Sequence, residues 1–300
     1  MIPGLGGRIT SFRSVRTGQE FLLQSLRDPV SDPATIAFSE GHLGGFDECL
    51  PSVSSCGAIG SEAEVPDHGD LWRIPWSVRP EERGFLLEAD AVSRPLKLSR
   101  LATLSADTLT LNYELRNTSS SPLTWLWCAH PLLYAEAGDR ILLPQETDKV
   151  TVEYAYHQMF HRRKEISWPL ACTRSGDQVD LSLLQHEPGG SACKLFARSG
   201  SSGNVTLYRS RIQQAIALHF EPAALPFVGI WINAGAWPEQ NPDRRFTVAL
   251  EPATCNYDSL VEANDHGAAG HLAGGASKQW ALSLQLLGAK GPCAPADVVL

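Results

Sequence analysis

The chain has 300 residues and a net charge of −8, from 25 Lys and Arg against 33 Asp and Glu. This acidic balance argues against electrostatic binding to nucleic acid or to an anionic membrane. The seven cysteines are an odd number without a C-x-x-C pair, so the sequence indicates neither a disulfide framework nor a zinc knuckle. The first residues lack the features of a secretory signal, and no stretch has the length and composition of a membrane span. We therefore expect a cytoplasmic protein.

Alternation of apolar and polar residues predicts strands along the whole chain. The clearest segments, in chain order, are 108–115, 150–156, 246–251 and 280–286. In the second segment the apolar face consists of Val150, Val152, Tyr154 and Tyr156. In the third, Phe246, Val248 and Leu250 form the apolar face, which predicts that Glu251 points away from the core.

The segments between these strands are rich in turn-forming residues. Residues 117–122 and 199–204 combine Gly, Ser, Asn and Pro, which favour tight reversals. The best helical segment is the short one after Asp258, the glycine-rich stretch 267–275 is typical of a mobile loop, and residues 291–300 are expected to lie across the surface. We expect an all-β, antiparallel fold and one domain spanning residues 1–300.

Several catalytic motifs are absent from the sequence. It has no G-x-S-x-G elbow, no Walker loop, no H-E-x-x-H pair and no glycine spacing for a dinucleotide. His157 and His161 would suit a metal only on a helix, whereas the local pattern is that of a strand. We therefore predict no cofactor and no metal.

Imidazole, carboxylate and aromatic residues concentrate in four segments near expected strand ends, where scaffolds commonly display their sites. These segments are 45–51, 67–76, 125–134 and 226–254. In chain order they contain Gly45-Phe46-Asp47-Glu48, His68-Gly69, His130-Pro131, Trp231-Ile232-Asn233 and Leu250-Glu251-Pro252, preceded by Gly6-Gly7-Arg8-Ile9.

This ordered set resembles the aldose 1-epimerase (galactose mutarotase) superfamily, especially its bacterial members, over most of the chain. The resemblance implies a large antiparallel β-sandwich and an enzyme that interconverts the α and β anomers of an aldose. It also implies that His130 and Glu251 are the catalytic residues and that His68 contacts the substrate. Arg73 resembles the basic residue that often follows the H-G pair, although the spacing in His68-Gly-Asp-Leu-Trp-Arg73 is looser than in the best-known members.

The chemistry of anomer exchange fits these residue types. A proton must leave the anomeric hydroxyl while another reaches the ring oxygen, and two acid/base groups are enough. Histidine, with an ordinary pKa near ~6.5, can serve as the acid at neutral pH, and a carboxylate can serve as the base. Asp47 or Glu48 is expected to hold a sugar hydroxyl. Four tryptophans are candidates for stacking on the pyranose, and Trp231 is the best of them; the others are Trp72, Trp127 and Trp237.

Other interpretations remain open at this point. Each of these residues, taken alone, is more often structural than functional. The fold does not fix the activity, so a non-catalytic carbohydrate-binding protein is one alternative. Glycoside or polysaccharide cleavage is another, and it requires a second carboxylate within about 5 to 10 Å of Glu251, for which Asp47 and Glu48 are candidates. Residues 162–164, Arg-Arg-Lys, form either a solvated loop or a phosphate site. The sequence names neither the sugar nor the oligomeric state.

Overall fold

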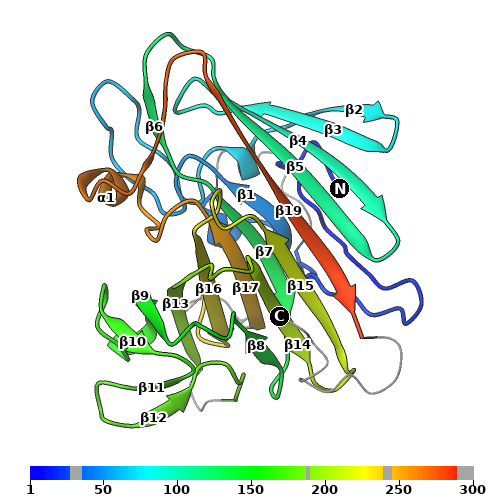
Figure 1. The fold of residues 1–300 in the computed structure, drawn as a ribbon, viewed down its shortest axis with the longest axis vertical. Coiled ribbons are helices and arrows are strands. Elements are labelled where there is room, and N and C mark those ends of the chain that lie inside the picture. The colour runs from blue at the N-terminus through cyan, green and yellow to red at the C-terminus, as the bar shows by residue number, and fades with distance from the viewer. Residues whose placement is uncertain (28–35, 187–189, 239–244, 289–300) are drawn as a thin grey trace.

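The computed structural model describes residues 1–27, 36–186, 190–238 and 245–288. Two large antiparallel sheets dominate the described chain (Figure 1). The first sheet has seven strands. Their order across the sheet is β1 (Gly45–Cys49), β7 (Cys128–Tyr134), β17 (Phe246–Ala253), β16 (Phe227–Ala234), β13 (Ser191–Arg198), β9 (Lys149–Ala155) and β10 (Glu165–Ser167).

The second sheet has eight strands, of which β4, β5 and β19 are the longest and run side by side (Figure 1). The order is β2 (Ser77–Glu81), β3 (Gly84–Asp90), β4 (Leu96–Ser105), β5 (Thr108–Asn117), β19 (Ser277–Leu287), β15 (Gln214–Phe220), β14 (Asn204–Arg209) and β8 (Arg140–Leu142).

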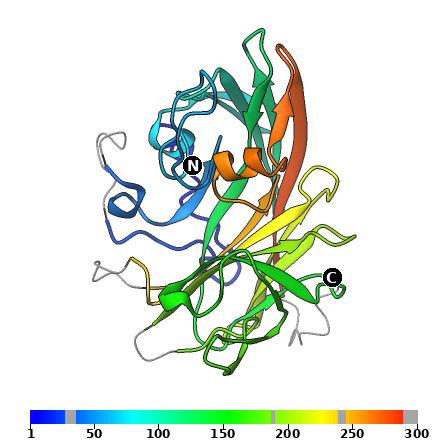
Figure 2. The same cartoon turned by 90° about the vertical axis from the view of Figure 1, so that its left-hand side faces the viewer.

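Short elements complete the described fold. Two strand pairs stand outside the large sheets, β11 (Leu170–Cys172) with β12 (Gln178–Asp180) and β18 (Gly270–Leu272) with β6 (Leu123–Trp125). The α-helix α1 (Leu260–Asp265) lies at the surface (Figure 2) and is capped by Ser259, whose side chain accepts a hydrogen bond from the Glu262 amide. Single 3-10 turns occur at η2 (Phe38–Glu40), η3 (Leu71–Arg73) and η4 (Tyr156–Gln158). No helix in the described ranges is long and apolar enough to cross a membrane.

The main apolar core lies between the two large sheets, because alternate residues of both contribute to one buried cluster. Val248 and Leu250 of β17 belong to it, together with Leu111 of β5 and Leu282 of β19. The intervening residue Ala249 belongs instead to a small cluster with Leu23, Leu132 and Trp231. The seven-stranded sheet therefore has one face in the main core and a second face that is available for a site.

The predicted all-β antiparallel class is confirmed, and the four predicted strands correspond to β5, β9, β17 and β19. The two predicted turns connect β5 to β6 and β13 to β14, and α1 lies where the sequence indicated a short helix. The stretch 267–275 differs from the expected loop because it contains β18, which pairs with β6. The prediction for residues 291–300 falls outside the described residues.

Strand β9 departs from the predicted alternation. Val150 and Val152 are in the main core, as expected, but Tyr154 is 38% exposed. The cause is a β-bulge against β13, where Lys194 pairs with Tyr154 while the next residue, Leu195, pairs with Val152. The extra residue shifts the side chains that follow it to the opposite face of the sheet. Tyr154 therefore lies on the same face as Lys194 and not in the core. Tyr156 begins η4 instead of continuing the strand.

Candidate active site

Neighbouring strands of the seven-stranded sheet bring distant residues into one row on its open face. Asp47 of β1 pairs directly with His130 of β7, and Gly229 of β16 pairs directly with Glu251 of β17. Glu251 and His130 are bracketed by the β17–β7 pairs Ala249–Leu132 and Ala253–Cys128. Residues at facing positions of adjacent antiparallel strands have Cβ atoms about 5 Å apart. His130 and Glu251 are therefore lateral neighbours in the sheet.

A cavity of about 620 Å³ lies over this row, a volume typical of small-molecule sites. Its lining includes five of the residues singled out from the sequence: His68, His130, Glu251, Trp231 and Trp237. The other polar residues that line it are Ser39, Ser54, Asp67, Tyr154, Lys194 and Asp258. The cavity thus combines two imidazoles, three carboxylates and one ammonium.

The backbone of the H-G pair explains how His68 reaches the cavity. His68 has a φ of 59° and Gly69 a φ of +75°. A Cβ at position 69 would lie 2.2 Å from the Leu50 carbonyl oxygen, so only glycine fits there. The His68 amide also donates to the Val53 carbonyl. The side chain is stacked on Phe38, with ring centroids 3.5 Å apart, and its Nδ1 lies 3.1 Å from Asp67 Oδ2.

His130 is 5% exposed and contacts His68 edge-on, with ring centroids 4.9 Å apart. Its Nδ1 is buried and makes no hydrogen bond within the described part of the chain. Burial, together with the charges of His68, Lys194 and Arg8, lowers the pKa of His130 well below 6.5. His130 is therefore neutral at pH 7 in the free protein, which corrects the expectation of an ordinary histidine pKa.

Glu251 is fully buried beneath the cavity, and its two carboxylate oxygens differ. Oε2 is bound by the ammonium of Lys194 and lies 3.3 Å from the thiol of Cys128. Burial and the Glu251 charge raise the pKa of Cys128 well above 9, so the thiol is protonated and donates. Oε1 has no hydrogen-bond partner among the described residues. One oxygen is thus anchored, whereas the other is buried without a hydrogen bond from the described chain.

Gly229 makes room for this arrangement. A Cβ at position 229 would lie 2.9 Å from Glu251 Oε2 and 3.1 Å from Lys194 Nζ. Lys194 projects from β13 and Glu251 from β17, with β16 between them. The glycine on the middle strand therefore lets the two side chains meet above it.

A second carboxylate approaches the same ammonium. Asp258 Oδ1 lies 3.8 Å from Lys194 Nζ. The Asp258 carbonyl accepts hydrogen bonds from the amides of Val53 and Ser54, which fix this loop. Burial raises the pKa of Asp258 to about 6, although the attraction of Lys194 opposes the rise.

Aromatic residues form one wall of the cavity. Trp231 contacts both Tyr154 and Trp237, with ring centroids 6.0 Å apart in each pair. Trp231 and Trp237 line the cavity, whereas Trp72 and Trp127 do not. Trp72 is buried with its Nε1 bonded to the Asp67 carbonyl, and Trp127 is in the main core.

Asp47 and Glu48 occupy opposite faces of β1, and neither lines the cavity. Asp47 is 1% exposed and its Oδ1 accepts from Arg8 Nε at 2.6 Å. Burial raises its pKa, against the attraction of Arg8. Glu48 lies on the core side, where it accepts hydrogen bonds from Arg100, Tyr113 and Trp127. Asp47 therefore lies beside His130 in the sheet, bound to Arg8 and outside the lining of the cavity, and its contact with a sugar hydroxyl stays a prediction.

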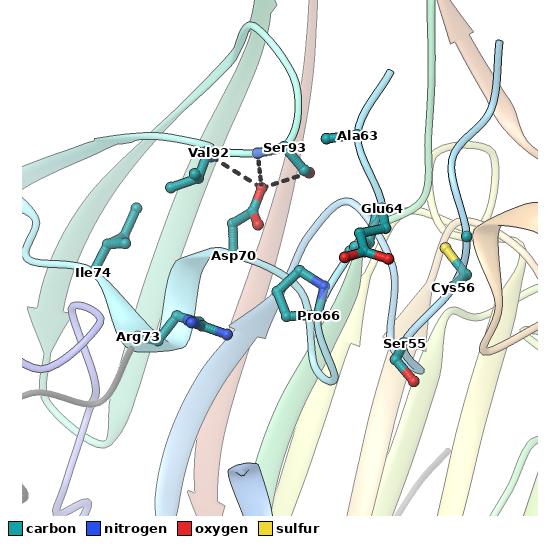
Figure 3. Close-up of a pocket in the computed structure, with 12 residues that line it drawn as sticks. Ser55, Cys56, Ala63, Glu64, Pro66, Asp70, Arg73, Ile74, Val92 and Ser93 are labelled. Atoms are coloured by element: carbon teal, nitrogen blue, oxygen red, sulfur yellow. Dashed lines mark hydrogen bonds between the residues drawn. The ribbon is translucent and has the colours of Figure 1, made fainter. Parts of the chain in front are cut away.

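Arg73 is also separated from the other predicted residues. It lines a different cavity of about 780 Å³, together with Asp70 and Ser93 (Figure 3). In that cavity Asp70 Oδ2 accepts hydrogen bonds from the Val92 amide and from the amide and hydroxyl of Ser93. The looser spacing after the H-G pair thus places Arg73 on η3, outside the row that contains His130 and Glu251.

The Arg162–Arg163 pair is engaged in ion pairs. Arg162 binds both Glu153 and Glu262, and Arg163 binds Glu153. Arg163 also stacks on Tyr257, 3.8 Å from the ring centroid. These carboxylates neutralise both guanidinium groups and tie β9 to α1, so the geometry does not favour the phosphate site considered for this segment.

Lys194, Asp258 and Gly229 were missed by the sequence analysis. Lys194 carries a detectable signal, because it is a lysine within the otherwise apolar run Ala192-Cys-Lys-Leu-Phe-Ala197, and a buried lysine needs a partner. Asp258 follows the Leu250-Glu251-Pro252 segment closely but lies in a loop, where alternation of residues does not predict the direction of a side chain. Gly229 is identified only once its strand neighbours are known.

Comparison with known proteins gives the same fold. No protein-family model and no curated protein sequence matches the chain. Among solved structures, a galactose mutarotase related enzyme from Lactobacillus acidophilus has a TM-score of 0.66 at 16% identity, covering 97% of this chain and 95% of that one. A galactose mutarotase-like protein from Lactobacillus casei has a TM-score of 0.60 at 14% identity, covering 95% and 96%. A candidate aldose 1-epimerase from Klebsiella pneumoniae has a TM-score of 0.70 at 14% identity, covering 98% and 78%. The chain therefore has the galactose mutarotase-like β-sandwich fold.

Proposed function

We propose that the protein is an aldose 1-epimerase that interconverts the α and β anomers of a monosaccharide or sugar derivative. The observation that carries this proposal is the lateral pairing of His130 with Glu251 beneath a sugar-sized cavity. Each of the two residues presents an unpartnered buried atom, Nδ1 and Oε1, within the described structure. A proton acceptor and a proton donor are what the reaction requires.

In the proposed mechanism, Glu251 Oε1 takes the proton of the anomeric hydroxyl while protonated His130 delivers a proton to the ring oxygen. The bond between the anomeric carbon and the ring oxygen breaks, and the open-chain aldehyde forms. Rotation about the adjacent carbon–carbon bond turns the other carbonyl face toward the ring hydroxyl. Reversal of both proton transfers then closes the ring as the other anomer. His68 is proposed to orient hydroxyl groups, and Trp231 to stack on the sugar.

The structure favours this reaction over glycoside cleavage for a specific reason. Cleavage by the common route needs two carboxylates facing each other across the anomeric carbon. Asp47 and Glu48 are bound to Arg8 and Arg100 and lie outside the cavity. Of the other two carboxylates that line the cavity, Asp258 shares the ammonium of Lys194 with Glu251, and Asp67 lies beside His68 Nδ1.

A binding protein and an epimerase differ in one measurement. Saturation-transfer NMR across a panel of free aldoses and sugar phosphates reports anomer exchange directly. We expect at least one aldose to exchange faster than its spontaneous rate, and Glu251→Gln to remove the acceleration. A sugar that binds in titration calorimetry without faster exchange in the wild-type protein would support the non-catalytic carbohydrate-binding alternative instead.

We further propose that residues 1–300 act as one domain, because the main buried cluster draws on residues from Ile9 to Leu284. The proposed cytoplasmic location agrees with six free cysteines among the described residues, four of them buried. Fractionation of the source cells with a tagged chain tests the location.

A further inference from the structure

Lys194 is buried in the candidate site, in contact with the proposed base. It is 5% exposed, and its ammonium contacts the carboxylates of Glu251 and Asp258. Burial alone lowers a lysine pKa, but the attraction of Asp258 and Glu251 raises the pKa of Lys194 above its ordinary value. Lys194 is therefore a permanent positive charge between two carboxylates.

The two carboxylates lie at different distances from the Lys194 ammonium. Glu251 Oε2 is in direct contact with the ammonium, whereas Asp258 Oδ1 lies 3.8 Å away and has no hydrogen bond within the described ranges. A positive charge in contact with a carboxylate stabilises its ionised form and weakens it as a base. A second negative charge beside the same ammonium offsets part of that effect.

We propose that Lys194 and Asp258 are positioning residues that set the strength and orientation of Glu251. Lys194 fixes Oε2 so that Oε1 receives the substrate proton, and the negative charge of Asp258 offsets part of the ammonium's attraction for Glu251. The effect on catalysis rests on the proposed function. The effect of the two charges on Glu251 can be measured in the protein without substrate.

Other titratable and charged groups surround the cluster of Lys194, Glu251 and Asp258. They are Cys49, Asp47 and Arg8 near β1, Cys128 and His130 on β7, Glu153 and Tyr154 on β9, and Asp67 and His68 in the H-G loop. Removal of Lys194 or Asp258 leaves all of these in place. The two removals change the charge beside Glu251 in opposite directions, which separates this proposal from a purely structural role.

The test follows proton uptake by Glu251 in protein labelled with 13C at the glutamate carboxyl carbons, without substrate. The Glu251 signal is assigned by its loss in Glu251→Gln. We expect the midpoint to rise by about one pH unit in Lys194→Met and to fall by about half a unit in Asp258→Asn, because opposite charges within 4–6 Å shift carboxylates by this order. Lys97→Met is the matched control, since Lys97 pairs with Glu88 at 3.1 Å on β4 and β3, in the other sheet.

The acidic limb of the pH–rate profile should move in the same two directions for a competent aldose. Midpoints that stay unchanged, or that move in one common direction, would overturn the proposal even if the protein is an active epimerase. Opposite shifts in a wild-type protein that accelerates no sugar would uphold the electrostatic cluster and reject the epimerase function. If Lys194→Met does not fold, Lys194→Gln replaces it and should also raise the Glu251 midpoint. Asp258→Asn should still lower it.

Discussion

Lys194 and Glu251 form a buried ion pair that crosses an intervening strand above Gly229. The side chains come from β13 and β17, and they meet only because β16 carries no side chain at that position. The anchoring of Glu251, the proposed base, therefore depends on Gly229, a residue without a side chain.

Gly229→Ala should therefore open the ion pair while it preserves the fold. The added methyl would lie 3.0 Å from Lys194 Cε and 2.9 Å from Glu251 Oε2, and these flexible ends move more easily than the backbone. We expect turnover to fall by about tenfold and the free energy of unfolding by about 1–3 kcal/mol, as for other overpacked sites. The control is Gly4→Ala, where a Cβ meets nothing within 4 Å. Wild-type turnover with the pair intact in a structure of the variant would contradict the prediction.

Glu251→Gln tests the base directly. The amide has nearly the same shape but cannot accept the anomeric proton, so we expect turnover to fall by at least ~10²-fold with sugar affinity retained. Polarimetry gives the rate and calorimetry the affinity. The surface substitution Glu114→Gln, on the other sheet, serves as the control. Near-normal turnover in folded Glu251→Gln protein would remove Glu251 from the mechanism.

The pH dependence of kcat/KM should be bell-shaped with an acidic optimum. The pKa of His130 lies well below 6.5, chiefly because of burial, so its protonated form is lost as the pH rises through a value under 6.5. The alkaline limb should therefore lie below pH 6.5, and the two limbs belong to the coupled pair with Glu251. Exchange rates from about pH 4 to 9, corrected for the spontaneous reaction, measure it. His130→Asn should remove the alkaline limb and most activity; an unchanged bell in that variant would reject the assignment.

His68 and Arg73 should behave differently, although sequence resemblance assigned both to substrate binding. His68 lines the cavity over Glu251, whereas Arg73 lines the other one. We expect His68→Ala to raise KM about tenfold, the loss of about 1.4 kcal/mol of binding. Arg73→Ala should change KM by less than about twofold. Equal effects of the two substitutions on KM would show that the two cavities are functionally connected.

Asp258→Asn should stabilise the protein in a pH-dependent way. The pKa of Asp258 is raised from 3.8 to about 6, so the native state binds more protons than the unfolded state between these values. Stability is therefore lost as the pH rises through this window, and the penalty is complete above pH 6. We expect the variant to gain up to about 3 kcal/mol at pH 8 and less than about 1 kcal/mol near pH 4. Urea unfolding at both pH values tests this, with exposed Asp90→Asn as the control.

The sequence predicted features that depend on local order. Alternation along 246–251 placed Glu251 opposite Val248 and Leu250, and the structure has this arrangement. Alternation failed at Tyr154 because a bulge is defined by the partner strand, not by the strand's own residues. The pairing of Asp47 with Arg8 was not predicted either, since it depends on a contact between β1 and the N-terminal segment.

The sequence signals that Lys194 is buried and needs a partner, but it does not indicate which carboxylates Lys194 contacts. Which strands lie beside β13 is a property of the sheet order, and that order follows none of the local patterns. The family resemblance of an ordered set of motifs pointed to His68, His130 and Glu251, which line one cavity in the structure, but it did not point to the groups that contact them.

The interruption between β7 and β17 has a further consequence. The paired residues on either side of it are Ala249–Leu132 and Ala253–Cys128, and the segment between them contains Pro131 and Pro252. A proline has no N–H to donate to a neighbouring strand. The described β7–β17 pairing is thus interrupted where His130 and Glu251 stand side by side. Amide exchange around the two prolines should report sugar binding more sensitively than any other part of this sheet, because a ligand that bridges both side chains supplies the cross-strand link that the backbone lacks.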